Sequence, residues 1–229
     1  MKSIAIITAR GGSKRIPRKN IKEFLGKPII AYTIEAALAS NMFDEVMVST
    51  DDEEIADIAK EFGAAVPFYR SEATSNDFAT TADVIDEVLN MYSKQGKSFD
   101  YMCCMYPTAP FVTTEAVATA MKELVDCGAD TVLPVVRYSF PPQRGVVIED
   151  GFVKAKYPEC QLMRSQDLEP MYHDAGQFYC MNVQAFLEQK KVIMNNTRPY
   201  IQDEINVQDI DTVEDWEIAE VKYKVLHKI

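Results

Sequence analysis

The chain has 229 residues and a formal net charge of −11, and its 47% hydrophobic content is ordinary for a globular protein with a core. Nucleic acids and anionic membranes repel so acidic a chain at long range, so we expect neither as a partner. No apolar run approaches the roughly 18 residues of a membrane-spanning helix, and residues 4–9 are too short for a secretory signal. The five cysteines show no CxxC spacing, which favours buried thiols over zinc or disulfides. We therefore expect a cytoplasmic protein.

Short apolar runs with strand character alternate with segments of helical period along most of the chain. In chain order, strands are predicted at residues 4–9, 45–50, 65–69, 101–105 and 131–136. Helices are predicted at residues 28–40, 51–62, 80–92, 113–125 and 212–226. This alternation predicts an α/β fold with a Rossmann-like, mostly parallel sheet that has helices on both faces.

The pattern changes between residues 137 and 172. A turn at Glu149-Asp150-Gly151 separates two β-rich runs, which predicts an inserted β-hairpin. Apolar sequence returns at residues 177–183, and no repeat, low-complexity tract or linker interrupts the chain. We therefore predict one domain over residues 1–229, in which residues 137–172 form either an interaction element or a plain surface ribbon.

A cluster of cations follows the first predicted strand directly. Its five members lie within ten residues: Arg10, Lys14, Arg15, Arg18 and Lys19. Open α/β sheets bind ligands beyond the carboxyl ends of their strands, and Gly11-Gly12 lets the backbone pass close to a ligand. The segment matches neither GxxxxGK[ST] nor GxGxxG. Local basicity in an acidic chain indicates a small polyanion, with a solvated basic loop as the alternative.

A pair of carboxylates stands near the other end of the chain. Asp209 and Asp211 are two residues apart, so on an extended segment both side chains point the same way. Mg²⁺ is commonly held by one or two carboxylates together with phosphate oxygens. The alternative is helix capping, because acidic residues near Thr212 stabilise the start of a helix. With the basic loop, the pair indicates Mg²⁺-dependent nucleotide chemistry.

The run Arg10-x-Gly12-Ser13-Lys14-x-x-x-x-Lys19-Asn20 resembles the signature of the acylneuraminate cytidylyltransferase family. Further segments resemble the family in the same order, at residues 24–38, 48–64, 77–84, 106–110 and 209–212. Residues 172–179 and 141–145 most resemble the branch that acts on pseudaminic acid. The resemblance covers nearly the whole chain.

The resemblance implies transfer of CMP from CTP to the anomeric hydroxyl of a nine-carbon 2-keto sugar acid, with release of pyrophosphate. The implied nucleotide-binding residues are Arg10, Gly12, Ser13, Lys14, Asn20, Arg70 and Thr81, and the implied catalytic residues are Arg10, Lys14, Lys19 and Asp211. Mg²⁺ is expected on Asp209 and Asp211. The sugar acid is expected over Tyr106, His173, Asp174, Gln177 and Tyr179. The family also implies a homodimer in which the hairpin reaches the neighbouring subunit.

Two departures from sialic acid enzymes fall on the sugar side. Tyr106 stands where those enzymes usually have Gln before the PTSP loop, and Asp174-Ala175-Gly176-Gln177 replaces a usual Asn-Gly. These departures favour pseudaminic acid over N-acetylneuraminic acid. Legionaminic acid, N-acetylneuraminic acid and 3-deoxy-manno-octulosonic acid stay open as alternative substrates. A non-catalytic nucleotide-binding regulator is the alternative of another class, and a structural hydrogen-bonding role is the alternative for His173.

Overall fold

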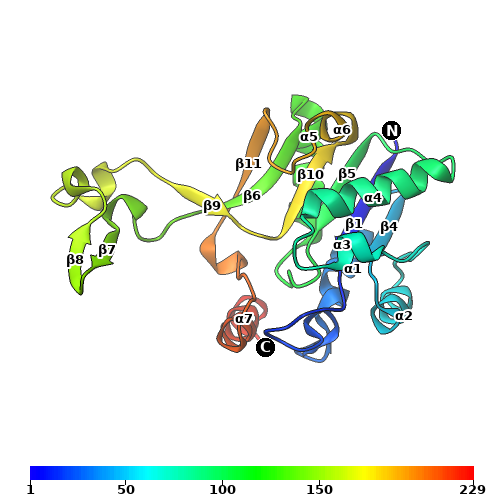
Figure 1. Ribbon diagram of the computed structural model, residues 1–229, viewed down its shortest axis with the longest axis horizontal. Helices are drawn as coiled ribbons and strands as arrows, with labels where there is room; N and C mark the ends of the chain where they lie inside the picture. Colours follow the sequence, from blue (N-terminus) through cyan, green and yellow to red (C-terminus); the bar gives the residue numbers. More distant parts are fainter.

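The computed structural model describes residues 1–229 and has a seven-stranded sheet at the centre of its main body (Figure 1). The strands lie in the order β11 (Thr197–Gln202), β6 (Thr131–Arg137), β10 (Phe178–Asn182), β5 (Tyr101–Met105), β1 (Ser3–Thr8) and β4 (Glu45–Ser49), and β9 (Tyr172–Asp174) pairs with β6. Five strands run in one direction, while β9 and β10 run the opposite way. The predicted α/β fold with a mostly parallel sheet is confirmed.

Helices cover both faces of this sheet (Figure 1). One face carries α1 (Ile29–Ala39), α2 (Glu53–Glu61) and α5 (Thr114–Cys127), and the other carries α4 (Thr81–Lys94) and α6 (Val183–Gln189). Successive strand residues point to opposite faces, so Ile7 of β1 joins the core under α1 and α5, whereas Ile6 joins the core under α4. None of the helices is both long enough and apolar enough to span a bilayer.

A third apolar cluster lies beside the sheet and supports the carboxyl end of the chain. Helix α7 (Val213–His227) buries Trp216 against Phe24, in the small hairpin of β2 (Glu23–Phe24) and β3 (Lys27–Pro28). Ile16 from the basic loop and Ile210 from the segment before α7 are buried in the same cluster. The two segments of the chain that carry most of the charged candidate residues are therefore anchored in one apolar core.

The predicted helices and the other predicted strands agree with the structure to within two residues at either end. Thr80 and Thr212 each form a capping box with the aspartate three residues later, which fixes the starts of α4 and α7. The predicted strand at residues 65–69 is wrong. Ala65 forms a single bridge with Met47, and Pro67 lacks the N–H that a longer ladder needs. The expected burial of the thiols is confirmed for Cys103, Cys104 and Cys180, but Cys127 is exposed and Cys160 is half-buried.

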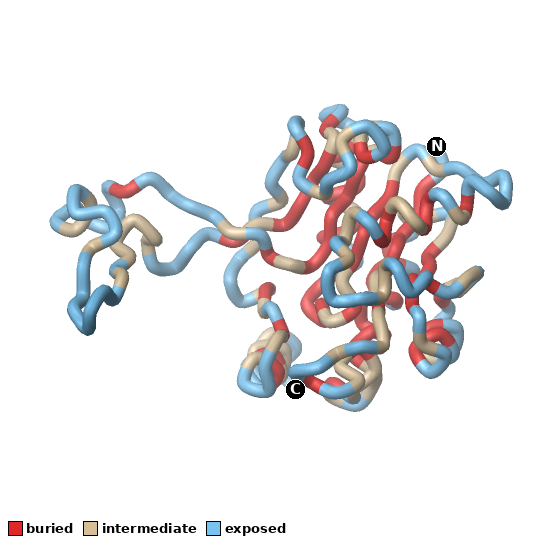
Figure 2. The backbone as a smooth tube through the Cα atoms, viewed as in Figure 1, coloured by how far each residue is buried: buried red, intermediate tan, exposed pale blue.

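The predicted hairpin is present as β7 (Val146–Glu149) and β8 (Phe152–Ala155), joined by Asp150 and Gly151 with positive φ. It belongs to residues 138–171, which we call the arm. The arm stands away from the main body and is largely exposed (Figures 1 and 2). It leaves the sheet after Arg137 and returns at Tyr172, which are paired neighbours in β6 and β9. The short helix α3 (Glu72–Ser75) precedes α4.

Candidate functional site

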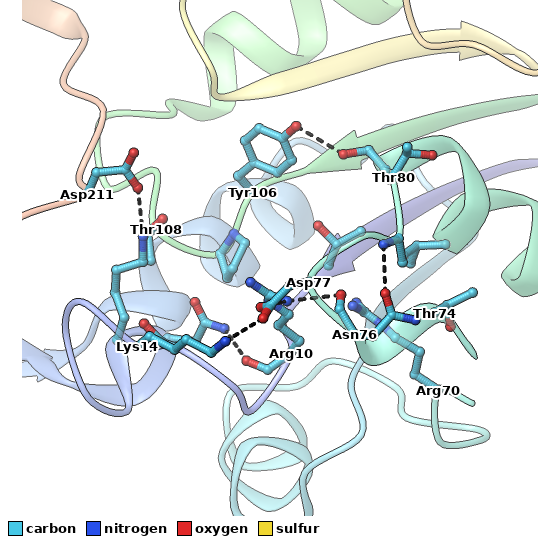
Figure 3. Close-up of a pocket in the computed structure, with 18 of the residues that line it drawn as sticks. Arg10, Lys14, Arg70, Thr74, Asn76, Asp77, Thr80, Tyr106, Thr108 and Asp211 are labelled. Carbon is cyan, nitrogen blue, oxygen red and sulfur yellow. Dashed lines mark hydrogen bonds and ion pairs between the residues drawn. The ribbon is translucent and has the colours of Figure 1, made fainter. Parts of the chain in front are cut away.

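A polar cleft of about 570 Å³ lies beyond the carboxyl ends of β1 and β5 (Figure 3). Four parts of the chain line it: the loop after β1, the segment from Arg70 to the start of α4, the loop after β5, and the segment before α7. Because β1 and β5 are parallel neighbours, the loops that follow them meet at the same edge of the sheet. The cleft therefore lies where the basic loop was expected to bind its ligand.

The basic loop is shaped by hydrogen bonds within it and to α2. The buried Asn20 side chain donates to the Arg10 carbonyl oxygen at 2.9 Å, and the Ser13 hydroxyl donates to that of Ile16 at 2.6 Å. The Gly11 N–H donates to Asp51 Oδ1 at 2.8 Å, and a Cβ at Gly11 would lie 2.8 Å from Asp52 Oδ2. A larger residue at position 11 would have to push the Asp52 side chain aside, whereas the neighbouring Gly12 faces open space.

Four of the five predicted cations line the cleft, and each is paired with a carboxylate. Asp77 pairs with Arg10 at 2.9 Å and Lys14 at 2.5 Å, and Asp211 pairs with Arg15 at 2.8 Å and Lys19 at 3.5 Å. Hydrogen bonds from Lys14 and Arg10 hold the pKa of Asp77 below its usual range. Positive charge for a polyanion is thus concentrated in the cleft but already partnered in the ligand-free protein.

Arg18, the fifth cation, lies outside the cleft, and its inclusion in a ligand-binding cluster is corrected. Its guanidinium spans both oxygens of Asp52, at 2.5 and 2.9 Å, and also contacts Glu54 at 2.5 Å. Asp52 Oδ1 also accepts from the Ile55 N–H and so caps α2. The hydrogen bond with Arg18 is the main reason that the pKa of Asp52 is lowered. Arg18 therefore fastens the basic loop to the start of α2.

Arg70 and Thr81 lie in the cleft, as expected for residues at one end of a nucleotide site. Arg70 is 8% exposed, and its Nε and Nη2 donate to the Ser49 hydroxyl and carbonyl oxygens at 3.1 and 2.7 Å. Burial lowers the pKa of its guanidinium. The Thr81 hydroxyl lies 3.1 Å from the Tyr106 hydroxyl, which joins the start of α4 to the loop after β5.

Asp209 and Asp211 both line the cleft, on an extended segment whose intervening Ile210 is buried on the opposite side. Burial, and then the charge of Asp211, raise the pKa of the Asp209 carboxyl. Close carboxylates that oppose each other's ionisation favour a bound cation. No group of three or more His, Cys, Asp or Glu side chains is placed to hold a metal, so this pair would need oxygen ligands from elsewhere.

A comparison with known protein families identifies the family of the chain that forms this cleft. Residues 4–202 match the family described as Cytidylyltransferase. The chain belongs to the cytidylyltransferase family. The resemblance seen in the motif around Arg10 is confirmed.

Relatives of this cytidylyltransferase match it over nearly its whole length. It is 39% identical over 229 residues to the pseudaminic acid cytidylyltransferase of Campylobacter jejuni, covering 100% of this chain and 99% of the relative. It is 36% identical over 232 residues to the CMP-N,N'-diacetyllegionaminic acid synthase of Legionella pneumophila, covering 96% and 95%. A solved CMP:2-keto-3-deoxy-manno-octonic acid synthetase complexed with CTP has a TM-score of 0.71 and 19% identity, covering 100% of both chains. That last likeness establishes the fold alone.

The residues expected on the sugar side of the cytidylyltransferase cleft divide into three groups. Tyr106 lines the main cleft. His173 and Asp174 line a second cleft of about 280 Å³, which shares Asp209 with the first. Tyr179 and Gln177 are buried behind them: the Tyr179 hydroxyl donates to Asp174 Oδ2 at 2.6 Å, and the Gln177 side chain donates to the Asn206 carbonyl oxygen at 2.8 Å.

His173 also has partners of its own. Its Nδ1 lies 2.9 Å from the Asp174 carbonyl oxygen, and its ring centroid lies 4.9 Å from that of Tyr138 at the base of the arm. The ring thus connects β9, the second cleft and the arm. Its polar contact is compatible with the structural alternative, while its position beside Asp209 is compatible with the sugar-binding one.

Several residues that line the cleft of this cytidylyltransferase have no site role predicted from the sequence, among them Arg15, Asp77 and Thr108. Arg15 was noticed only as a charge, and Asp77 only as part of a motif. The signal for Thr108 was its position directly after the strand that ends at Met105, because parallel strands end at the ligand-binding edge. No sequence signal pairs Asp77 with Arg10 and Lys14, since the contact depends on how α3 packs.

Proposed function

We propose that this cytidylyltransferase transfers CMP from CTP to the anomeric hydroxyl of pseudaminic acid, giving CMP-pseudaminic acid and pyrophosphate. One observation carries the nucleotide part: four cations and the Asp209–Asp211 pair line a single cleft at the carboxyl ends of parallel strands. Full-length similarity to a protein named pseudaminic acid cytidylyltransferase supports the choice of sugar. The other sugar acids remain outcomes of the test below.

In this proposal the basic loop binds the triphosphate. Arg10, Lys14 and Lys19 neutralise the negative charge that develops as the sugar hydroxyl attacks the α-phosphorus and pyrophosphate leaves. Ser13, Asn20 and the open backbone at Gly12 shape the loop around the phosphates and ribose, and Arg70 and Thr81 lie near the cytosine. Little covalent chemistry is required of the protein, so positioning and charge neutralisation account for its contribution.

Mg²⁺ is part of the proposal, and the donor set fits it. Asp209 and Asp211 offer hard oxygen ligands on one side of an extended segment. Burial, and then the charge of Asp211, raise the pKa of Asp209, and a bound cation would offset both effects. Asp209 and Asp211 would hold the ion, which would supply positive charge next to the phosphates. Asp211 is catalytic in this sense, and Arg15 and Lys19 hold it until then.

The sugar acid is proposed to lie between Tyr106 and the second cleft. Tyr106 lines the main cleft, and its ring meets that of the buried Tyr179 edge to face with centroids 5.7 Å apart. His173 and Asp174 would contact the sugar from the second cleft, because they line it beside Asp209. Tyr179 and Gln177 would support this wall from behind, since both are buried.

We also propose a homodimer held together by the arm, within a single domain of residues 1–229. The arm exposes large apolar side chains that its own fold leaves uncovered: Val146, Ile148, Phe152, Val153 and Leu162. Exposed apolar side chains in this number indicate a protein interface. We expect Leu162→Asp to shift the protein from dimer to monomer in light scattering, while Glu159→Asp on the same arm leaves the dimer intact. A wild-type monomer would remove this part of the proposal.

The cell compartment and the excluded partners complete the proposal. Five free cysteines, including Cys103 and Cys180 with sulfur atoms 3.5 Å apart, suit the reducing cytoplasm, where we place the enzyme. Neither nucleic acid nor membrane is proposed as a partner, because the net charge is −11 and four cations of the basic loop line one cleft.

A pyrophosphate-release assay tests the function. CTP and Mg²⁺ are supplied with pseudaminic, legionaminic, N-acetylneuraminic or 3-deoxy-manno-octulosonic acid in turn, and we expect kcat/KM to be highest for pseudaminic acid. A higher value for another sugar would replace the substrate and keep the chemistry. Tight CTP binding without pyrophosphate release for any sugar would instead support a nucleotide-binding regulator.

A further inference from the structure

Asp77 forms ion pairs with two of the cations on which the proposed nucleotide binding depends. Its carboxylate oxygens are divided between them: Oδ1 accepts from Arg10 Nη1 at 2.9 Å and Oδ2 from Lys14 Nζ at 2.5 Å (Figure 3). Two cations around two oxygens of one anion is the arrangement that a phosphate group would adopt with the same side chains. The Asp77 carboxylate thus contacts the same two side chains that a phosphate group would contact.

The position of Asp77 is set by its surroundings. The preceding Asn76 accepts from the N–H groups of Phe78 and Ala79 at 2.8 and 3.0 Å, and its carbonyl oxygen accepts from Arg10 at 3.0 Å. The segment is tied to α4 by Glu87, which accepts from the Ser71 N–H at 2.9 Å. Asp77 is therefore presented to the cations by a fastened backbone.

The Asp77 side chain can nevertheless move away from both cations. The Asp77 side chain is 44% exposed and the Lys14 side chain 78%, so these are solvent-screened ion pairs of the kind that contribute little stability. Rotation about the Asp77 χ1 angle would break both pairs without disturbing the core. The two ion pairs are therefore weak enough to be exchanged for contacts with a bound anion.

Asp77 differs in this respect from Asp211, the other carboxylate that pairs with two cations in the cleft. In the proposed function Asp211 would hold a divalent cation, so Arg15 and Lys19, its present partners, would be available to phosphate oxygens. Asp77 is not part of the Asp209–Asp211 pair to which the cation is assigned, and its ion pairs are with Arg10 and Lys14. Bound phosphate must therefore displace it outright.

We propose that Asp77 is an internal anion that competes with the triphosphate for Arg10 and Lys14, and so lowers the affinity of the cleft for nucleotide and for pyrophosphate. The inference rests on the proposed function for the identity of the ligand. Its consequence is easier release of pyrophosphate, because the Asp77 carboxylate re-forms its ion pairs as the product leaves. Asp77 is thus a residue that sets affinity, distinct from the residues that hold the ligand.

Calorimetric titration with inorganic tripolyphosphate, without CTP or sugar, tests the competition directly. Loss of two exposed ion pairs corresponds to about a 2- to 30-fold gain in affinity, so Asp77→Asn should bind tripolyphosphate more tightly by that factor. Asp77→Ser should do the same, and it serves as a second neutral variant should the first fold poorly. Asp77→Glu, which keeps the charge, should stay within about twofold of the wild type.

The matched control is Asp86→Asn. Asp86 lies on α4, outside the cleft, and the substitution removes its exposed ion pair with Lys190. It carries the same change of net charge, so any general electrostatic gain appears there too, and the Asp77 variants must exceed it. Unchanged or weaker binding in both neutral Asp77 variants would overturn the proposal and make Asp77 a residue that orients Arg10 and Lys14. Tighter binding in the absence of turnover with any sugar would leave this inference standing while the proposed function fails.

Discussion

Ile210 offers a direct test of how the two cleft carboxylates are held. Its side chain is 1% exposed and lies in the cluster of Ile16, Phe24 and Trp216, while Asp209 and Asp211 on either side line the cleft. Ile210→Ala removes three carbon atoms, worth about 0.8 kcal/mol each in transfer free energy, and leaves a cavity. We expect the free energy of unfolding to fall by about 2–4 kcal/mol, which a domain with about 5–15 kcal/mol of stability survives.

The substitution should also weaken the response of the enzyme to Mg²⁺, which a loss of stability alone would not do. Without its apolar anchor the segment samples other conformations, and if about a tenth of the molecules keep both carboxylates in place, the half-saturating Mg²⁺ concentration rises about tenfold. Urea unfolding measures the first effect, and pyrophosphate release over a MgCl₂ titration measures the second. Val88→Ala, in the core under α4, is the matched control: it should lose stability and keep the wild-type Mg²⁺ dependence. An Ile210→Ala enzyme that is less stable but needs no more Mg²⁺ would refute the anchoring argument.

Three further outcomes are expected. Lys14→Ala should lower kcat for pyrophosphate release by about 100-fold or more with an unchanged melting temperature, because the side chain is exposed and acts on developing charge; near-normal turnover would remove Lys14 from the catalytic residues. Asp211→Ala should abolish the response of the rate to Mg²⁺, and a titration curve like that of the wild type would contradict its assignment. Asp52→Asn keeps a good helix cap but loses the ion pair with Arg18. Since the pKa of Asp52 is lowered, that stabilisation is present above about pH 4 and is lost as the pH falls through the lowered pKa, so the two unfolding free energies should converge in acid. A difference that stays constant with pH would show that the ion pair is not its source.

Local pattern was sufficient for the elements that are buried and periodic, and insufficient at the edge of the sheet. Strand β11 was not predicted, because Thr197–Gln202 is mostly polar or exposed and contains Pro199. Proline is tolerated there because β11 is the outer strand of the sheet, a fact that only the assembled fold supplies. Residues 65–69 were predicted for their apolar character, yet Pro67 stands where the strand would have to continue. The same residue type thus had opposite consequences at two positions.

The site was predictable in its chemistry and not in its pairings. The position of the basic loop follows from the first strand, and the carboxylate pair follows from a two-residue spacing. What could not be predicted is which cation meets which carboxylate. Arg18 lies among the other cations in the sequence, but its left-handed backbone, with φ of 55°, accompanies a side chain that turns outward to Asp52. Gln177 was predicted to contact the sugar because its segment resembles the family, but the buried Gln177 side chain donates to Asn206, 29 residues away in the sequence.

The place where the arm joins the sheet has a consequence for how such a protein can diversify. Arg137 and Tyr172, the residues on either side of the arm, are opposite one another in adjacent antiparallel strands. The arm therefore leaves the sheet and returns to it at two paired residues, as a long loop between two antiparallel strands does. Residues can be added to it, removed from it or exchanged within it without changing the register of any strand that ends at the cleft. The exposed surface of the arm is free to change in evolution while the residues that line the cleft stay where they are.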